Sequence, residues 1–345
     1  MIDEKLFLRP DGRRWIDCDP LVLSPALTSK ASQIGYGRVQ ASICEPLECV
    51  GGIKFVEETG FDWDYRLFFG WPRAWMIGHN FVNGIVEDAI IHTMYEAEEL
   101  PPGWVGVLNR FRLVWVPSQW VKDKFEENGV TAPIMKSGYG VNNLEFPYVE
   151  RDDGPFTFIT IGHSMHGRKG VDVVWHCFNR LKLKGELKDA RLIVKTQKGL
   201  VSKASWLENA DGTSKQAVGS NSVKFVFDTL DDQGYANLLL HAHCLVYPQY
   251  SEGFGLIPLE FMATGGCAMV TNKTGCKEYL REDVSIMLPP VVSKSELMDR
   301  MLWAYNNRSE VKDIGIRAAE YVRAEWSWFH AGAKARTQLY EHLGR

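Results

Sequence analysis

The chain has 345 residues, of which 45% are hydrophobic and 24% are charged, a composition typical of globular proteins. This length is long for a single hydrophobic core and favours two domains of about 150 to 200 residues each. The net charge of −4 argues against broad electrostatic capture of nucleic acid, although a local basic patch is compatible with it.

The cysteines and the amino terminus bear on metal binding, cellular location and membrane insertion. Seven cysteines are scattered without a Cys-x-x-Cys pair or a Cys/His ligand spacing, so the sequence predicts no zinc site. Several stand in apolar stretches as reduced core residues, which favours a cytoplasmic location. The first residues, Met-Ile-Asp-Glu-Lys, are charged, and no run of about 18 apolar residues occurs. We therefore expect neither a signal peptide nor a membrane span.

The first half of the chain predicts an irregular α/β domain. Short apolar runs indicate strands, at residues 21–24, 65–69, 85–93 and 113–117. A glycine-rich turn with Gly35 and Gly37 precedes a helical pattern, and any tight turn that needs positive φ would use the same residues. His92 closes the third apolar run, where a core role and a ligand-facing role are both open.

Two Asp-x-Asp strings raise the question of a metal site. They are Asp17-Cys18-Asp19 and Asp62-Trp63-Asp64. Such a pair can hold Mg²⁺ or Mn²⁺. Neither string follows a hydrophobic strand, so we favour turn or capping roles for both.

The second half of the chain predicts a parallel, doubly wound sheet. The charged string Glu-Arg-Asp-Asp-Gly-Pro at residues 150–155 predicts the domain boundary. Strand and helix patterns then alternate as in a doubly wound α/β domain. Strands are expected at residues 156–161, 191–196, 223–227, 245–247 and 267–271, and helices at 170–183, at 235–242 and from about 295 onward. Residues 202–222 predict a polar loop insertion.

A basic turn joins the first of these strands to the first helix. It contains His163, Arg168 and Lys169. Because ligands of open α/β sheets bind outside the carboxyl ends of the strands, a cation here is well placed to neutralise a diphosphate. A solvated basic helix start and a histidine metal site with His166 are the alternatives. Lys195 ends the next strand and either binds phosphate or nucleobase in the same crevice or extends to solvent.

The most informative segment is residues 247–265, Tyr-Pro-Gln-Tyr-Ser-Glu-Gly-Phe-Gly-Leu-Ile-Pro-Leu-Glu-Phe-Met-Ala-Thr-Gly. If Glu252 lies on a loop and Glu260 in the first turn of a helix, both carboxylates face one ligand and can accept hydrogen bonds from sugar hydroxyls. Unpaired backbone N–H groups at the helix start suit an anion such as a diphosphate. We expect these to come from Gly253, Phe254, Gly255 and Leu256. An ordinary strand–turn–helix with an acidic first turn is the alternative.

Together these motifs resemble the donor site of retaining glycosyltransferases of the family 4 type (glycosyl transferases group 1). The resemblance covers most of the chain and is strongest from residue 156 onward. It implies the GT-B fold, an α/β architecture of two Rossmann-like doubly wound domains that face each other across a cleft. Residues 1–150 would form the acceptor side, residues 151–325 would bind the nucleotide sugar, and a helix at 326–345 would cross back to the first domain.

The resemblance also implies roles for single residues. Glu260 would bind ribose hydroxyls, Glu252 the hydroxyls of the donor sugar, and Lys169 the diphosphate. His92 would touch the donor sugar or the acceptor, and the loop with Gly35 and Gly37 would approach the sugar diphosphate. His163 stands where the family usually has an arginine, so either one positive charge is missing or Arg168 supplies it. Because the protein supplies the positive charge, no metal is required.

The implied reaction is a retaining, hexosyltransferase-like transfer of a sugar from a nucleotide-diphosphate donor to a saccharide or glycoconjugate. UDP- and GDP-sugars are the favoured donors. Two other functions stay open, a GT-B nucleotide-sugar epimerase and a sugar-nucleotide-binding subunit without activity. A modified nucleobase in DNA is an outlying acceptor, which the acidic balance disfavours.

Overall fold

The computed structural model describes residues 21–27, 36–55, 64–72, 86–164, 167–196, 222–227 and 229–344. The chain divides into two compact units. Unit 1 comprises Met1–Asn142 with Trp326–Arg345, and unit 2 comprises Asn143–Glu325. Gly35, His166, the string Asp17-Cys18-Asp19 and residues 202–221 lie outside the described residues, as do two of the three residues of the string ending at Asp64.

The described strands of unit 1 form a parallel six-stranded sheet in the order β2-β1-β3-β4-β5-β6. Its strands are β1 (Leu21–Leu27), β2 (Ile53–Phe55), β3 (Tyr65–Phe69), β4 (Val86–His92), β5 (Phe111–Val116) and β6 (Ile134–Lys136). Its helices are α1 (Tyr36–Cys49), α2 (Trp104–Leu108), α3 (Gln119–Glu127) and α11 (Trp328–Leu343). Parallel sheets are covered on both faces, which explains why every residue of β5 except Arg112 is apolar and buried.

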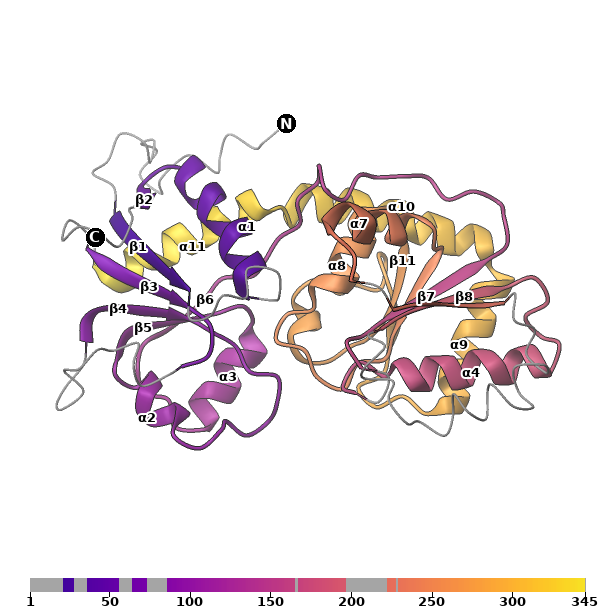
Figure 1. Cartoon of the computed structure of the whole chain (residues 1–345), viewed down its shortest axis with the longest axis horizontal. Helices are drawn as coiled ribbons and strands as arrows, with labels where there is room; N and C mark the ends of the chain where they lie inside the picture. Colours follow the sequence, from indigo (N-terminus) through magenta and orange to yellow (C-terminus); the bar gives the residue numbers. More distant parts are fainter. Residues whose placement is uncertain are drawn as a thin grey trace. The chain divides into compact units, whose positions relative to one another are not determined.

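Helix α11 is the carboxyl-terminal helix of the chain, and it packs on α1 within unit 1 (Figure 1). Small residues allow the close approach, because a Cβ at Gly332 would lie 3.2 Å from the backbone of Pro46. Near the same place the guanidinium of Arg336 is buried and donates to the carbonyl of Val50. The tail of the chain is therefore part of the first unit's fold.

Unit 2 is a second parallel sheet, in the order β12-β11-β10-β7-β8-β9. Its strands are β7 (Thr157–Ile161), β8 (Arg191–Lys195), β9 (Val223–Val226), β10 (Cys244–Tyr247), β11 (Cys267–Thr271) and β12 (Ile286–Leu288). Its helices are α4 (Val171–Leu183), α7 (Asp232–Leu240), α8 (Leu256–Ala263), the 3₁₀ helix η6 (Thr274–Glu278), α9 (Lys294–Asn306) and α10 (Arg308–Glu325). Helices α4 and α9 pack together on one face of the sheet, and α8 and α10 on the other (Figure 1).

The strand order of unit 2 reverses between β7 and β10. From β7 the chain runs outward through β8 to β9, and it then returns to place β10 on the other side of β7. In open α/β sheets, ligands bind outside the carboxyl ends of the strands at this reversal. The topology therefore directs attention to the two loops that follow β7 and β10.

The chain enters unit 2 at Asn143, before the boundary at residue 150 that the charged string predicts. The reason is that this string is anchored to unit 2. The amide of Val149 donates to the carbonyl of Thr264 at 3.1 Å. The buried guanidinium of Arg151 donates to Ala242 O and to Thr264 Oγ1, each at 2.7 Å, at the carboxyl ends of α7 and α8. A cation is favoured there by the helix dipole.

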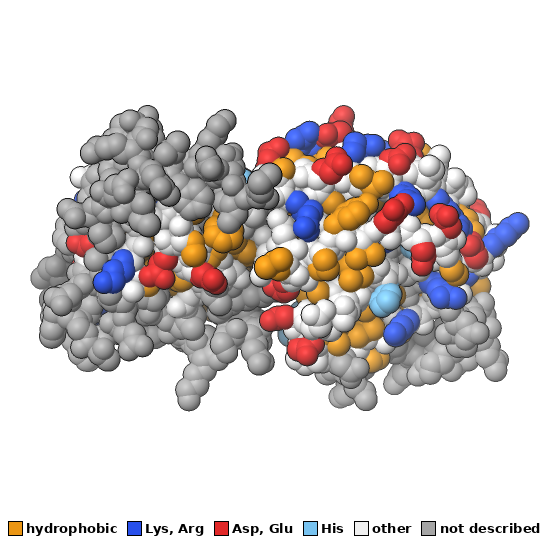
Figure 2. Space-filling model, turned by 90° about the horizontal axis from the view of Figure 1, so that it is seen from above, with side chains coloured by type: hydrophobic (Ala, Val, Ile, Leu, Met, Phe, Trp, Pro, Cys, Tyr) orange, Lys and Arg blue, Asp and Glu red, His pale blue; other side chains and the backbone are white. Residues whose placement is uncertain are grey.

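The hydrophobicity of the helices and the distribution of surface charge bear on binding to membranes and to polyanions. None of the helices among the described residues is long and apolar enough to cross a membrane. On the face of unit 2 in Figure 2, Lys and Arg side chains are interspersed with Asp and Glu. That face lacks the single-sign field that a polyanion needs.

Candidate functional site

The loops after β7 and β10 lie against each other at the reversal of the strand order. The amide of Tyr250 in the second loop donates to the carbonyl of Arg168 in the first at 2.6 Å. Gly170 ends the first loop with φ 65° and caps α4. A Cβ at this glycine would lie 2.8 Å from the carbonyl oxygen of Pro248, so glycine permits the close approach.

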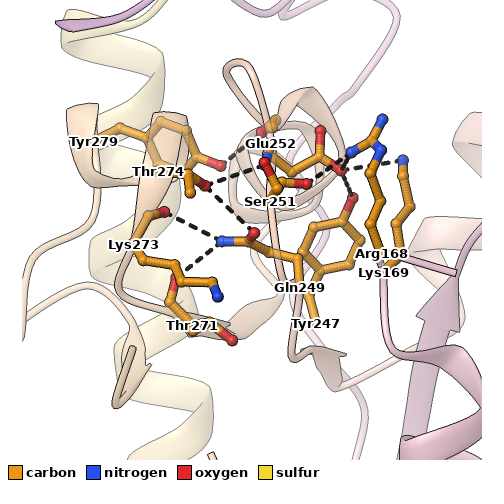
Figure 3. Close-up of polar contacts among 11 residues, drawn as sticks. Arg168, Lys169, Tyr247, Gln249, Ser251, Glu252, Thr271, Lys273, Thr274 and Tyr279 are labelled. Atoms are coloured by element: carbon orange, nitrogen blue, oxygen red, sulfur yellow. Dashed lines mark hydrogen bonds and ion pairs between the residues drawn. The ribbon is translucent and has the colours of Figure 1, made fainter. Parts of the chain in front are cut away.

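Glu252 is the centre of this site (Figure 3). Its side-chain oxygen Oε1 accepts a hydrogen bond from the Tyr247 hydroxyl at 2.6 Å. The same oxygen lies 2.7 Å from Nη1 of Arg168 and 3.5 Å from Nζ of Lys169. Glu252 is only 6% exposed, so this convergence of two cations on one carboxylate is built into the fold.

The electrostatics of the cluster determine its protonation state. Burial raises the pKa of Glu252, but Lys169, Arg168 and the Tyr247 hydroxyl outweigh burial and hold the pKa below its ordinary value of 4.5. Burial, followed by the Glu252 charge, raises the pKa of Tyr247 well above 10. At neutral pH Glu252 is therefore a carboxylate and Tyr247 a neutral donor.

The Gly-Phe-Gly turn after Glu252 leads into helix α8 at Leu256. Gly255 caps this helix with φ 88°, and its carbonyl accepts a hydrogen bond from the Tyr279 hydroxyl at 2.6 Å. A Cβ at Gly255 would collide with Cys276 Sγ, so the turn is confined to glycine by both space and conformation. The positive end of the α8 dipole lies directly beyond the Glu252 loop, where an anion is favoured.

Glu260 is the fifth residue of α8, just past the first turn in which the sequence predicts it. It is buried, and its Oε2 accepts a hydrogen bond from the hydroxyl of Tyr235 on α7 at 2.9 Å. Burial raises the pKa of Tyr279 well above 10, followed by smaller contributions that include both Glu252 and Glu260. The charges of both glutamates thus disfavour ionisation of this buried phenol.

The carboxyl ends of β7 and β8 bring His163 and Lys195 to the same edge of the sheet. The amide of Gly162 donates to the Lys195 carbonyl at 3.0 Å, and Thr196 Oγ1 donates to the His163 carbonyl at 3.3 Å. His163 is exposed, and Arg168 makes the ion pair with Glu252. Across the part of the chain that the structure describes, no three His, Cys, Asp or Glu side chains are grouped as a metal site requires.

His92 lies in unit 1, at the carboxyl end of β4, with 0% of its surface exposed. Its ring stacks on Phe69 at 5.2 Å and on Tyr139 at 5.5 Å, and meets Trp115 edge-on at 4.8 Å. Burial lowers the pKa of His92 from 6.5 to about 3, so the ring is neutral. Its contact with donor or acceptor stays a prediction. Gly37 is the second residue of α1, one residue after the described segment begins.

The structure adds three residues to those named from the sequence: Tyr247, Tyr235 and Thr274. Thr274 Oγ1 accepts from the Glu252 amide at 3.1 Å. Tyr247 is the last residue of β10, and Thr274 follows β11, so the rule about strand carboxyl ends identifies both positions once the strands are known. Tyr235 carries no such signal, because its approach to Glu260 depends on how α7 packs.

Known proteins resemble this chain in sequence and in fold. Residues 143–321, just over half of the chain and nearly all of unit 2, match the family model described as Glycosyl transferases group 1. An uncharacterized glycosyltransferase of Methanocaldococcus jannaschii is 24% identical over 228 residues. The alignment covers 66% of this chain but only 58% of that relative, so the chain spans less than two thirds of its length.

Solved structures resemble the chain over 82% to 94% of its length. A glycosyltransferase from Rickettsia africae aligns with a TM-score of 0.68 at 14% identity, covering 94% of this chain and 98% of that one. Anabaena HepE in complex with UDP and glucose aligns with a TM-score of 0.69 at 12% identity, covering 93% and 100%. Sucrose-phosphate synthase from Thermosynechococcus elongatus aligns with a TM-score of 0.58 at 18% identity, covering 82% and 69%.

At these identities the structural likeness establishes the fold, two Rossmann-like α/β domains of the GT-B type. The family match establishes more, because it spans over half of the chain and includes the whole Glu252 loop, Lys169 and helix α8. The chain belongs to the glycosyl transferases group 1 family.

Proposed function

We propose that this protein is a retaining glycosyltransferase that moves a sugar from a nucleotide-diphosphate donor to an acceptor. One observation carries the proposal, the buried Glu252 carboxylate held between Arg168 and Lys169 at the reversal of the strand order. A carboxylate accepts hydrogen bonds from sugar hydroxyls, while the two cations beside it attract the diphosphate. A nucleotide-diphosphate sugar carries both kinds of group, hydroxyls and a diphosphate, on one molecule.

Unit 2 supplies the stabilisation of the leaving group. As the bond between sugar and diphosphate breaks, negative charge builds on the phosphate oxygens. Lys169, Arg168 and the positive end of α8 lie where that charge develops, and fixed charges of this kind lower the barrier. Because the protein supplies these charges, the proposed reaction requires no metal.

The two ends of the donor have different partners in this proposal. Glu252 binds hydroxyls of the transferred sugar, and Glu260 binds hydroxyls of the ribose. Lys195 and His163 line the nucleotide side, at the carboxyl ends of β7 and β8. We favour a UDP-sugar, because HepE of the same fold is described in complex with UDP and glucose. GDP-sugars are the second choice.

The acceptor is a saccharide or glycoconjugate bound on unit 1. Support comes from Trp71, which is 51% exposed and packs on Trp104 with ring centroids 6.3 Å apart. Tyr95 packs on the same Trp104 at 5.0 Å. Trp71 and Tyr95 follow the carboxyl ends of β3 and β4, where open sheets bind ligands. A flat aromatic face suits the C–H surface of a pyranose ring.

A cytoplasmic location agrees with the free, buried thiols of Cys177, Cys244, Cys267 and Cys276.

A thermal-shift screen of UDP-, GDP- and ADP-sugars tests the donor assignment, since a bound donor stabilises the native state by mass action. We expect one nucleotide class to raise the melting temperature, and no shift with any donor would contradict the proposal.

The donor that binds is then incubated alone and with saccharide acceptors, and the product's anomeric configuration is read by NMR. Transfer with retention supports the proposal. Conversion of the donor alone identifies an epimerase, and binding without turnover identifies a non-catalytic subunit.

A further inference from the structure

Thr274 has an unusual backbone conformation beside the Glu252 loop. Among the described residues it is the one non-glycine residue with positive φ, at 55°. For a β-branched residue this region is a genuine outlier, and adopting it has an energetic cost. A glycine would adopt the same conformation without that cost. The sequence therefore retains a strained residue where a relaxed one would fit.

The Thr274 side chain joins two residues of the site loop (Figure 3). Its Oγ1 accepts a hydrogen bond from the Glu252 amide at 3.1 Å and donates to Gln249 Oε1 at 3.4 Å. A threonine hydroxyl has one proton and two lone pairs, so both bonds can be made at once. Thr274 is buried, as is Gln249, so neither bond is readily replaced by water.

Gln249 is itself held in one orientation. Its Nε2 donates to the carbonyls of Thr271 and Lys273, each at 3.2 Å, which leaves Oε1 for the threonine hydroxyl. The amide of Gly275 donates to the Glu252 carbonyl at 2.9 Å. The loop after β11 thus holds both the N–H and the C=O of Glu252, and the strained turn brings the hydroxyl to the first of them.

We propose that Thr274 is a positioning residue for Glu252, and that its backbone strain is retained because its hydroxyl fixes the Glu252 loop. The role in sugar transfer rests on the function proposed for Glu252, whereas the role in ordering the loop does not. A displacement of about 1 Å at a catalytic group can lower turnover about a hundredfold, so a single hydrogen bond at this place has a large effect.

Three substitutions separate the hydroxyl from the strain. Thr274→Ser keeps the hydroxyl, Thr274→Gly removes both the hydroxyl and the strain, and Thr274→Val removes the hydroxyl and keeps the β-branched strain. Thr337→Val, which removes a threonine hydroxyl on α11 in unit 1, is the matched control. We expect kcat for sugar transfer to fall at least about tenfold in the glycine and valine variants and to stay within about twofold in the serine and control variants.

The glycine variant decides between positioning and stability. It is expected to melt above the valine variant yet to be equally impaired in kcat, while the Kd for the bare nucleoside diphosphate stays within about twofold of wild type in both. If turnover instead follows the melting temperature, so that Thr274→Gly transfers sugar at the wild-type rate, Thr274 has only a structural role and the proposal is overturned.

Hydrogen exchange of the backbone amides at residues 248–255 measures how well ordered the loop is, and it needs no substrate. Faster exchange is expected in the glycine and valine variants and not in the serine variant. Unchanged exchange in all three overturns the proposal even if the enzyme is active. If the wild-type protein transfers no sugar, the proposed function fails, and the exchange data still decide whether Thr274 orders the loop.

Discussion

Nη1 of Arg168 lies 2.7 Å from Glu252 Oε1 and donates to the Ser251 carbonyl at 2.8 Å. This cation stands one residue before Lys169, in the same loop as the exposed His163. Arg168 is therefore a candidate source, within the same loop, of the charge that an arginine at position 163 would carry.

The first prediction is that an arginine at position 163 can replace the positive charge of Arg168. Arg168→Gln is expected to weaken binding of the nucleoside diphosphate about tenfold, the effect of losing one charge-assisted hydrogen bond. Adding His163→Arg to that variant is expected to restore most of the affinity, measured by calorimetry. Arg180→Gln, the same change at an exposed position of α4, is the control. Failure of the second substitution to restore any affinity would show that the two positions do not share one role.

Glu260 is expected to discriminate ribose from dideoxyribose. Glu260→Gln should weaken binding of a nucleoside diphosphate about tenfold, because a charged acceptor of the ribose hydroxyls is lost. The 2′,3′-dideoxy analogue has no such hydroxyls, so its Kd should be the same for variant and wild type. Tyr235→Phe, which removes the hydrogen bond to Oε2, should give a smaller loss of the same kind. Equal losses for both nucleotides would place Glu260 away from the ribose.

His92 predicts a pH dependence of stability. Its folded pKa of about 3 lies below the ordinary 6.5, so the unfolded state binds more protons between these values. The contribution of the neutral His92 ring to the free energy of unfolding is present in full above pH 6.5. It is lost as the pH falls toward 3, and the free energy of unfolding is lower by about 2 kcal/mol at pH 5. His92→Phe keeps an aromatic ring in the stack and should remove this loss. Unfolding at pH 5 and pH 8 measures it, with exposed His241→Asn as the control. Equal pH slopes for His92→Phe and wild type would contradict the burial argument.

Trp71 is expected to act on the acceptor alone. Once a saccharide acceptor is found, Trp71→Ala should raise its KM about fivefold to tenfold, because an exposed aromatic face is lost. The KM for the donor should not change. Leu144→Ala removes an exposed apolar side chain in unit 2 and should change neither value. An unchanged acceptor KM in the Trp71 variant would move the acceptor site elsewhere.

The strand–loop–helix around Glu252 was predictable because its signals are local. A run of buried apolar residues, a glycine turn and Pro258 near a helix start each have a backbone reason, and together they give β10 and α8. The parallel, doubly wound second sheet follows from the alternation of strand and helix patterns in the same way. The opposite charges of Glu252 and Lys169 also indicate a site for sugar hydroxyls and a diphosphate before any contact is known.

Contacts that depend on packing were not predictable. Three-residue strands, β2 and β6 in the first sheet and β12 in the second, are too short for a periodic signal, which is why the first half of the sequence has an irregular pattern. The string at residues 150–155 has the composition of a linker, and only tertiary structure reveals that Arg151 is buried at two helix ends. The strain at Thr274 likewise cannot be predicted from the sequence, because a threonine gives no indication of a positive φ.

The central claim is that the loops after β7 and β10 bind the diphosphate of a nucleotide sugar, and Lys169 tests it most directly. Calorimetric titration of wild type, Lys169→Ala and the control Lys184→Ala with UDP and GDP compares the relevant affinities. Lys184 lies just past the end of α4, away from the loop. We expect Lys169→Ala to bind about tenfold more weakly than wild type, and Lys184→Ala to bind equally well. Equal binding by Lys169→Ala, or no binding of either nucleotide by wild type, would contradict the account.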